Sequence, residues 1–292
     1  MKKSILMKIN FGAVCGALLL VMITAPVSAA QDSIQIKGSD TMVNLVQAWS
    51  EEFMKIHPEA FVAVTGGGSG TGIAALINGT CDVAASSREI KPKEIEQATQ
   101  KGVMPHEYKA ALDGLAVVVN KNNPVSKLTI DQLAGIFSGK TKNWKEVGGS
   151  DENIVVLSRE VNSGTHVYFK EHVLRKNDPA SKEEFSQDAL LLPSSQAIAD
   201  EVLHNSAAIG YYGMGYIGKD HKAILIAKNS SSEYVYPTIN DVVSGRYPIS
   251  RPLYLYTPGE PAGQVKALMD FILSKEGQSI VSTMDFVPIH KD

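Results

Sequence analysis

The sequence predicts an α/β fold, because a strand, a turn rich in glycine or serine, and a helix follow one another repeatedly. Residues 33–38 alternate between polar and apolar and stop at Gly38, after which residues 42–53 show helical spacing. A second strand at 61–64 leads through a glycine-rich loop into a helix at 73–77. Repetition of this unit is typical of βαβ structure and of a largely parallel sheet.

The remaining elements follow from the same periodicities and from their end signals. A Ser-Asp-Thr run caps the first helix and His57-Pro58 ends it, while the strongest strand follows Asp113-Gly114. We expect further strands at residues 82–85, 115–120, 154–157, 208–212 and 252–256. We expect further helices at residues 130–137, 167–174, 196–204 and 263–274.

These elements fall into two groups, which predicts two similar α/β lobes with chain crossings near residues 115–120 and 222–228. The partition assigns residues 31–118 to the first part of lobe I, 119–222 to lobe II and 223–292 to the second part of lobe I. A hydrophobic content of 44% fits one or two well-packed domains.

Residues 1–30 have the order of a secretory signal peptide. Three lysines form a basic start, residues 11–24 are an apolar run, and small residues at 25–30 offer a cleavage position. The run is shorter than the ~18–20 apolar residues that a membrane-spanning helix needs. Cys15 lies within this run and follows a poor lipobox, so we expect no lipid tether and a periplasmic location.

Charge and cysteine content exclude several classes of function. The formal net charge is −3, and loss of the signal peptide with its three lysines lowers it to −6. Such a chain has no electrostatic footprint for nucleic acid or an anionic membrane. Cleavage leaves a single cysteine, Cys81, so an internal disulfide is impossible, and its apolar surroundings predict a small buried residue.

Three turns, at residues 38–42, 66–72 and 159–165, stand where helices are expected to begin. Each is a candidate anion cradle, because a helix N-terminus has unpaired N–H groups and the positive end of the dipole. Arg159 closes a strand just before Ser163-Gly164-Thr165, which places a guanidinium beside hydroxyl and amide donors. The alternative is that Arg159 is an exposed charge. The three turns together favour binding of a small, multiply charged oxyanion.

The glycine-rich loop at 66–72 has two interpretations. It lacks the Gly-Lys-Ser/Thr ending of a P-loop and the spacing of a dinucleotide fingerprint, so nucleotide binding is not expected. In one interpretation the glycines only supply the positive φ angles of a tight turn. In the other, the Ser69 hydroxyl and the N–H groups of Gly70 and Thr71 bind the oxyanion. The Ser-Asp-Thr run at 39–41 also has two interpretations, since these residues can cap a helix or bind the anion.

Five motifs in order resemble those of the phosphate-binding proteins of bacterial ABC phosphate importers. They are Gly38-Ser39-Asp40-Thr41, Gly67-Gly68-Ser69-Gly70-Thr71-Gly72, Ala85-Ser86-Ser87-Arg88-Glu89-Ile90, Asp113-Gly114-Leu115-Ala116-Val117-Val118-Val119-Asn120 and Arg159-Glu160-Val161-Asn162-Ser163-Gly164-Thr165. The likeness runs over nearly the whole chain after the signal peptide. It implies a type II periplasmic-binding-protein fold, in which each lobe is a mixed, mainly parallel sheet flanked by helices. It also implies a two-strand hinge about which the lobes close on phosphate.

The resemblance and the three anion cradles together predict phosphate contacts from both lobes. Those from lobe I are Ser39, Asp40, Thr41, Ser69, Gly70 and Ser87. Those from lobe II are Arg159, Ser163, Gly164 and Thr165. Four further candidates are Met42, Thr71, Arg88 and Asp113.

Ser87 departs from the family pattern, because the best-known members carry an aspartate that accepts the proton of hydrogen phosphate and so rejects sulfate. A serine hydroxyl both accepts and donates, so it discriminates weakly. Asp40 is our candidate for the replacement acceptor, with a plain helix-capping role as the alternative. We expect Asp113 to pair with a nearby base such as Arg88 at the lobe junction, although Arg88 is also a candidate ligand.

The sequence therefore predicts an exported receptor that binds inorganic phosphate without chemistry and delivers it to the membrane permease subunits of an ABC importer. We expect a monomer with no cofactor, because the histidines lack metal-ligand spacing and no nucleophile motif follows a strand. Two alternatives stay open. One is a receptor for sulfate, molybdate or tungstate, and the other is a secreted phosphoester hydrolase with a metal or an activated nucleophile beside the cradles.

Overall fold

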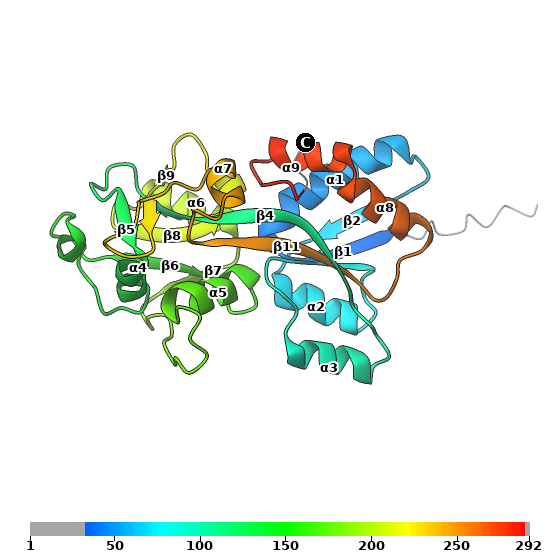
Figure 1. Ribbon diagram of the computed structural model, residues 1–292, viewed down its shortest axis with the longest axis horizontal. Coiled ribbons are helices and arrows are strands. Elements are labelled where there is room, and N and C mark those ends of the chain that lie inside the picture. The colour runs from blue at the N-terminus through cyan, green and yellow to red at the C-terminus, as the bar shows by residue number, and fades with distance from the viewer. Residues whose placement is uncertain (1–32, 290–292) are drawn as a thin grey trace, which may run out of the picture. The chain divides into compact units, whose positions relative to one another are not determined.

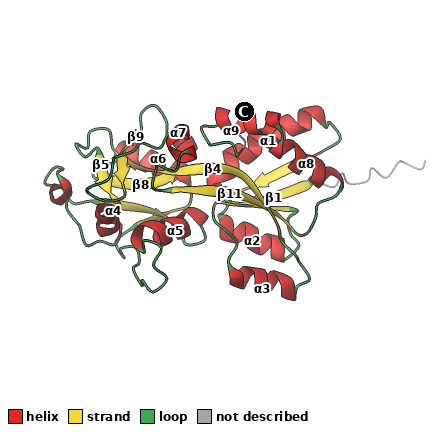
Figure 2. Cartoon of the chain, viewed as in Figure 1, coloured by secondary structure: helices red, strands yellow, loops and turns green. Residues whose placement is uncertain are grey.

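The computed structural model describes residues 33–289, in which helices and strands alternate as an α/β fold requires (Figures 1 and 2). The predicted signal peptide lies outside the described residues. The strands form a nine-stranded mixed sheet, in the order β2-β1-β3-β11-β4-β8-β6-β7 with β9 beside β4, and a separate pair, β10-β5. No helix within residues 33–289 is long and apolar enough to span a membrane.

The first lobe begins with three parallel strands whose positions match the predicted ones. These strands are β1 (Ile34–Gly38), β2 (Val62–Thr65) and β3 (Val83–Ser86). The helices that follow them are α1 (Val43–Ile56), α2 (Ser69–Ile77) and α3 (Pro92–Gln100). A short 3₁₀ turn (Asp40–Met42) precedes α1. All three turns after these strands lie at the carboxyl ends of parallel strands, where α/β sheets hold their ligands.

Two long antiparallel strands, β4 (His106–Val119) and β11 (Ser250–Thr257), join the two halves of the sheet (Figure 1). β4 begins nine residues earlier than the predicted 115–120, because the polar residues at its start hide the strand pattern. Ala110 and Ala111 of β4 belong to one hydrophobic core and Leu115 belongs to another. The strand therefore serves both lobes.

The second lobe contains the remaining strands and the middle helices. Its strands are β5 (Lys127–Thr129), β6 (Val155–Arg159), β7 (Leu190–Leu192), β8 (Ala208–Gly213), β9 (Lys222–Ala223) and β10 (Leu225–Ala227). Its helices are α4 (Ile130–Phe137), α5 (Gly164–Phe169), α6 (Ser195–His204) and α7 (Ile239–Val243). A π-helical turn (Lys170–Leu174) extends α5. The parallel pairing of β6 with β7 and β8 repeats the pattern of the first lobe.

The second crossing lies in β11, and the predicted crossing near 222–228 does not match the structure. β10 pairs with β5, and Ile224, Ile226 and Val242 share a core with Leu115 and Phe137 of the second lobe. A three-residue strand followed by a polar loop cannot be told from a crossing by composition, which explains the difference.

The chain then completes the first lobe with α8 (Gly263–Leu273) and α9 (Lys275–Thr283), where a single helix at 263–274 was predicted. Leu268 and Val281 from these helices enter the core built by α1, and the Trp49 indole N–H donates to the carbonyl of Gly277 at 2.8 Å. Cys81 is buried, as predicted. Each lobe therefore has its own hydrophobic core, which holds in place that lobe's half of a site between them.

Candidate functional site

The three predicted cradles meet at the junction of the lobes. Thr41, after β1, and Thr165, in α5, lie with their hydroxyl oxygens 2.8 Å apart. The main-chain N–H of Gly70 in α2 donates to the carbonyl of Asn162 at 3.0 Å, which joins the other two turns. Segments more than ninety residues apart in the chain thus form one site.

Two glycines are needed at this junction because nothing larger fits. A Cβ on Gly164 would lie 2.3 Å from the Ser69 Oγ and 2.7 Å from the Ser87 Oγ across the junction. Gly38 has φ +139°, and a Cβ there would lie 2.1 Å from the Ala85 carbonyl oxygen. Gly164 thus lets the backbone of one lobe approach the hydroxyl groups of the other, and Gly38 lets β1 lie close to the Ala85 carbonyl of β3.

The junction is lined by buried hydroxyl groups. They belong to Ser39, Thr41, Ser69, Ser87, Ser163 and Thr165, each at most 3% exposed. Ser69 and Ser87 are neighbours, with their oxygens 3.3 Å apart, and the N–H of Ser87 donates to the Ser69 Oγ at 3.0 Å. Ser163 caps α5 by accepting the N–H of Thr165 at 3.2 Å. Such a set offers many neutral hydrogen bonds to one oxyanion.

Arg159 supplies the cation of the second lobe, and its 1% exposure excludes the alternative of an exposed charge. Its guanidinium donates to the Ser195 Oγ and to the Pro193 carbonyl, both at 2.9 Å. Burial lowers the pKa of Arg159, and the nearby Asp40 carboxylate opposes this effect. Within residues 33–289 its Nε makes no hydrogen bond, so it keeps a donor for a ligand.

Asp40 faces this arginine from the other lobe, with its Oδ2 3.1 Å from the Arg159 Nη2. The same oxygen accepts the main-chain N–H of Ser195, at the start of α6, at 2.7 Å. The Asp40 carbonyl accepts the Tyr216 hydroxyl at 3.0 Å. Asp40 therefore contacts a helix start of the opposite lobe, which neither of the sequence interpretations anticipated.

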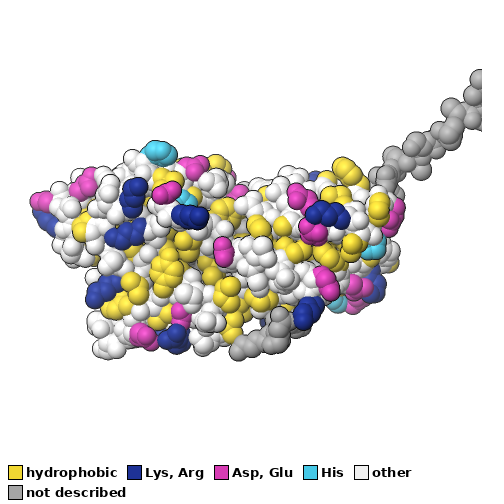
Figure 3. Space-filling view, turned by 90° about the horizontal axis from the view of Figure 1, so that it is seen from above, with side chains coloured by type: hydrophobic (Ala, Val, Ile, Leu, Met, Phe, Trp, Pro, Cys, Tyr) yellow, Lys and Arg dark blue, Asp and Glu magenta, His cyan; other side chains and the backbone are white. Residues whose placement is uncertain are grey.

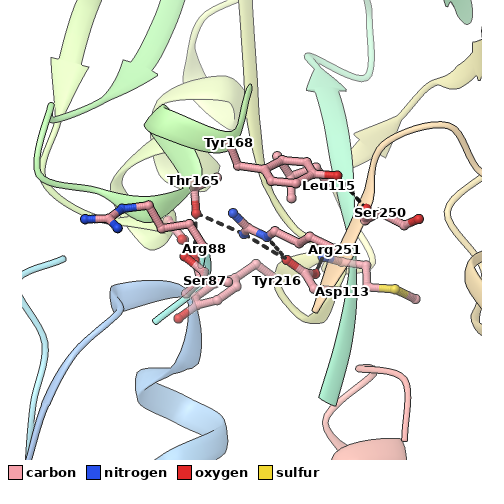
Figure 4. Close-up of polar contacts among 12 residues, drawn as sticks. Ser87, Arg88, Asp113, Leu115, Thr165, Tyr168, Tyr216, Ser250 and Arg251 are labelled. Carbon is pink, nitrogen blue, oxygen red and sulfur yellow. Dashed lines mark hydrogen bonds and ion pairs between the residues drawn. The ribbon is translucent and has the colours of Figure 1, made fainter. Parts of the chain in front are cut away.

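The predicted pair of Arg88 and Asp113 is wrong. Arg88 instead holds Glu94 of its own lobe through two hydrogen bonds of 2.8 and 2.7 Å. Asp113 is fully buried and accepts from the Nε and Nη2 of Arg251, at 3.1 and 2.9 Å (Figure 4). Burial raises the pKa of Asp113 and the Arg251 guanidinium opposes this.

Arg251, which was not predicted from the sequence, lies opposite Asp113 in the register of β4 and β11. Its Nη2 also donates to the Thr165 Oγ1 at 2.9 Å, so it reaches the cradle of the second lobe (Figure 4). The sequence signal that could have identified Arg251 is its position at the start of a strongly apolar strand. The pairing itself depends on residues 138 positions apart and has no local sequence signature.

The remaining candidates, Met42 and Thr71, make other contacts. Met42 is buried in the first-lobe core. The Thr71 hydroxyl donates to the Gly67 carbonyl at 2.8 Å, and the side-chain amide of Asn162 donates to the same carbonyl. Asn162 is a second residue that was not predicted from the sequence. Its hydrogen bonds to Gly70 and to the loop around Thr71 connect the two lobes.

The described residues offer one serine–histidine pair and no metal-binding cluster. None of the described histidines, cysteines and acids form a cluster able to hold a metal ion. The Ser158 hydroxyl does lie 3.3 Å from the Nδ1 of His166, but Ser158 is fully buried and is bonded to the Tyr211 hydroxyl at 2.7 Å. Burial lowers the pKa of His166 to about 4. This pair therefore serves the second-lobe core and cannot reach a substrate.

Comparison with known proteins gives one consistent set of relatives. A family model described as a PBP superfamily domain matches residues 24–276. The phosphate-binding protein PstS of Pseudomonas aeruginosa is 31% identical over 279 residues, which cover 90% of this chain and 84% of that protein. The PstS protein of Bacillus subtilis is 34% identical over 261 residues, covering 89% and 82%.

Two solved structures are similar in both fold and sequence. A substrate-binding protein assigned to a phosphate ABC transporter in Clostridium perfringens, solved with bound phosphate, has a TM-score of 0.79. It is 32% identical, and the match covers 89% of this chain and 100% of that one. An ABC-type phosphate transport receptor from Vibrio cholerae has a TM-score of 0.69 at 32% identity, with 87% and 99% covered.

Proposed function

Because this chain belongs to the PBP superfamily and, within it, to the PstS family of phosphate-binding proteins, we propose that it is the receptor of a phosphate importer. It captures inorganic phosphate between its lobes and delivers it to an ABC importer. The observation that carries this function is the meeting of Thr41 and Thr165, at 2.8 Å, inside a ring of buried hydroxyl groups next to Arg159.

Phosphate is held by groups from both lobes. The first lobe contributes hydroxyls of Ser39, Thr41, Ser69 and Ser87. The second contributes Arg159, Ser163, Gly164 and Thr165. Two buried atoms with no partner among residues 33–289, the Ser39 Oγ and the Arg159 Nε, support this assignment, because buried donors are rarely left unpaired. Since each half-site is incomplete, the anion stabilises the closed arrangement.

Asp40 is the proposed acceptor for the proton of hydrogen phosphate. It is the predicted site carboxylate that contacts Arg159, whereas Asp113 is engaged by Arg251. Ser87 faces the Ser69 hydroxyl and leaves the usual carboxylate position neutral. Discrimination against sulfate then depends on repulsion between the Asp40 carboxylate and an anion without a proton.

The receptor binds without catalysis, acts as an exported monomer and passes its ligand to membrane permease subunits. The relatives at 31–34% identity are named as phosphate-binding proteins, which supports a role in binding. The Ser158–His166 pair is buried in the second-lobe core and gives no support to the phosphoester hydrolase. A receptor for sulfate or another tetrahedral oxyanion is the second candidate, favoured by the serine at position 87.

Calorimetric titration with phosphate and then sulfate tests the function, using protein that has been unfolded and refolded to remove carried-over ligand. We expect phosphate to bind tightly at one site per chain and sulfate to give no heat of binding. Binding of sulfate alone would instead support the second candidate, a receptor for sulfate. Binding of neither anion would contradict the receptor function for both.

A further inference from the structure

Recognition of an anion by this chain must rely on buried groups. The formal net charge is −3, and on the face shown in Figure 3 cationic and anionic side chains are interspersed. Arg159 and Arg251 are among the largest fully buried side chains of the described residues. Arg159 belongs to the proposed phosphate site, and Arg251 lies beside that site with a different set of partners.

Arg251 is fixed at the place where the chain crosses between the lobes. It lies on β11 opposite Asp113 of β4, and the two side chains form a fully buried ion pair. Two residues before Arg251, Ile249 belongs to the second-lobe core, and two residues after it, Leu253 belongs to the first-lobe core. The ion pair therefore sits between the two cores.

One nitrogen of Arg251 serves two acceptors. Its Nη2 donates to the Asp113 Oδ2 and to the Thr165 Oγ1, both at 2.9 Å (Figure 4). Since each Nη of a guanidinium carries two hydrogens, one nitrogen can make both bonds at once. The bond to Asp113 sets the orientation of the guanidinium, and the bond to Thr165 extends that orientation into the cradle of the second lobe.

A second set of contacts holds α5 against Arg251. The guanidinium carbon lies 5.5 Å from the centre of the Tyr168 ring, and the Tyr168 hydroxyl donates to the carbonyl of Ser250, the residue before Arg251 (Figure 4). Tyr168 and Thr165 are three residues apart in α5, so they lie on the same face of the helix. The helix is thus tied to β11 at two points.

The bond from Arg251 limits what the Thr165 hydroxyl can do. A guanidinium can only donate, so the Thr165 oxygen is the acceptor of this bond and its own hydrogen is left for another partner. The Thr41 hydroxyl oxygen lies 2.8 Å away on the first lobe. The Thr165 hydroxyl is therefore held as a donor at the junction of the lobes, where phosphate is proposed to bind.

Two serines of the cradle obtain the same orientation from the main chain. The Ser69 Oγ accepts the Ser87 N–H at 3.0 Å, and the Ser163 Oγ accepts the Thr165 N–H at 3.2 Å. Hydroxyls that accept from the protein keep their hydrogens for a ligand, and the oxygens of an anion need donors. Thr165 differs from the serines because its orienting donor is a side chain 86 residues away in the sequence.

We propose that Arg251 is a positioning residue of the phosphate site, which holds the Thr165 hydroxyl as a donor to the anion. This role rests on the proposed function and adds to it a residue that shapes the site without contacting phosphate. A donor that is already oriented before binding loses less freedom when the anion arrives, so it contributes more to affinity.

The test is a mutant cycle between Arg251 and the Thr165 hydroxyl. Arg251→Met alone would leave Asp113 as an unpaired buried charge, so both charges are removed together. The paired change Asp113→Asn/Arg251→Met keeps the net charge and keeps an acceptor for the Met214 N–H. It is made in the wild type, in Thr165→Ser, which retains a hydroxyl, and in Thr165→Val, which retains the shape without the hydroxyl. Thermal unfolding shows that each variant is folded, and equilibrium dialysis with radiolabelled phosphate gives the dissociation constants.

We expect the paired change to weaken phosphate binding about tenfold in the wild type and in Thr165→Ser, but by less than about twofold in Thr165→Val. An equal loss in all three backgrounds would mean that Arg251 acts only through the fold. No loss in the wild type would mean that the Thr165 hydroxyl needs no support. Either result would overturn the positioning role while leaving phosphate binding intact, whereas absence of phosphate binding by the wild type would remove the proposed function and this role with it.

Discussion

The two halves of the site differ in kind. The first lobe presents four buried hydroxyls and the Asp40 carboxylate, with no cation among them, whereas the second lobe adds the buried Arg159 guanidinium to its hydroxyls. The second half can attract an anion by charge, since charge-assisted bonds are the stronger ones. Under the proposed function, the first half discriminates among anions by their shape and their protonation. We infer that affinity resides mainly in one lobe and selectivity in the other.

Replacing Arg159 with alanine should cause the largest loss. Truncation of a buried, hydrogen-bonded charge costs about 2–5 kcal/mol, so phosphate affinity should fall by about a hundredfold or more in calorimetric titration. Arg246→Ala, which removes an exposed arginine of the same lobe, is the matched control. Retention of wild-type affinity by the Arg159 variant would mean that the two halves do not differ in this way.

Gly164→Ala tests whether the halves must touch. The added methyl group would lie 2.3 Å from the Ser69 Oγ, so it should hold the lobes apart and weaken phosphate binding by roughly ten- to a hundredfold. Gly259→Ala is the control, because its Cβ would meet nothing within 4 Å. Calorimetry gives the affinity, and small-angle scattering with phosphate should show a more extended Gly164 variant. Normal binding and normal compaction would refute the close contact.

Asp40→Asn sharpens the assignment of selectivity to the first lobe. The asparagine keeps the size but loses the charge, so phosphate should bind about tenfold more weakly and sulfate should begin to bind. The exposed Asp220→Asn serves as the control. If sulfate still fails to bind, Asp40 has no part in discrimination and acts only as a contact between the lobes.

His166 should produce the smallest effect, on stability alone. Burial lowers its pKa to about 4, so the unfolded chain binds more protons at mildly acidic pH. Stability that is present at pH 7 is therefore lost as the pH falls from about 6.5 toward 4, by about 1 kcal/mol at pH 5.5. Urea unfolding at pH 7 and 5.5 should show this loss in the wild type, and His166→Gln should lack that part of it. An equal loss in both would mean that His166 is protonated in the folded protein and adds to the charge of Arg159.

The sequence predicted local features of the site and failed on distant ones. Gly38, Ser69 and Ser163 could be found because a strand, a turn and a helix cap are encoded within a few residues. The Arg251–Asp113 pair and the contacts of Asn162 could not, because strand register and lobe contact bring together residues far apart in the chain.

Prediction of the fold likewise succeeded for local elements and failed for contacts between distant residues. Strand positions near 33–38 and 82–85 were confirmed, since their periodicity is clear over a few residues. The second crossing was misplaced, because the pairing of β10 with β5 rather than its composition keeps that strand in the second lobe. Thus periodicity identified the elements, while the packing that assigns them to lobes required the structure.

The core of the first lobe draws on both ends of the described chain. The Trp49 indole of α1 donates to the Gly277 carbonyl, and Leu45 packs with residues such as Val281 of α9. The second-lobe segment between β4 and β11 is continuous, so it can fold before the C-terminal part of the chain has emerged. The first lobe cannot close its core until the last helices have emerged, which makes it the slower half to mature and the one that a C-terminal truncation would leave unfinished.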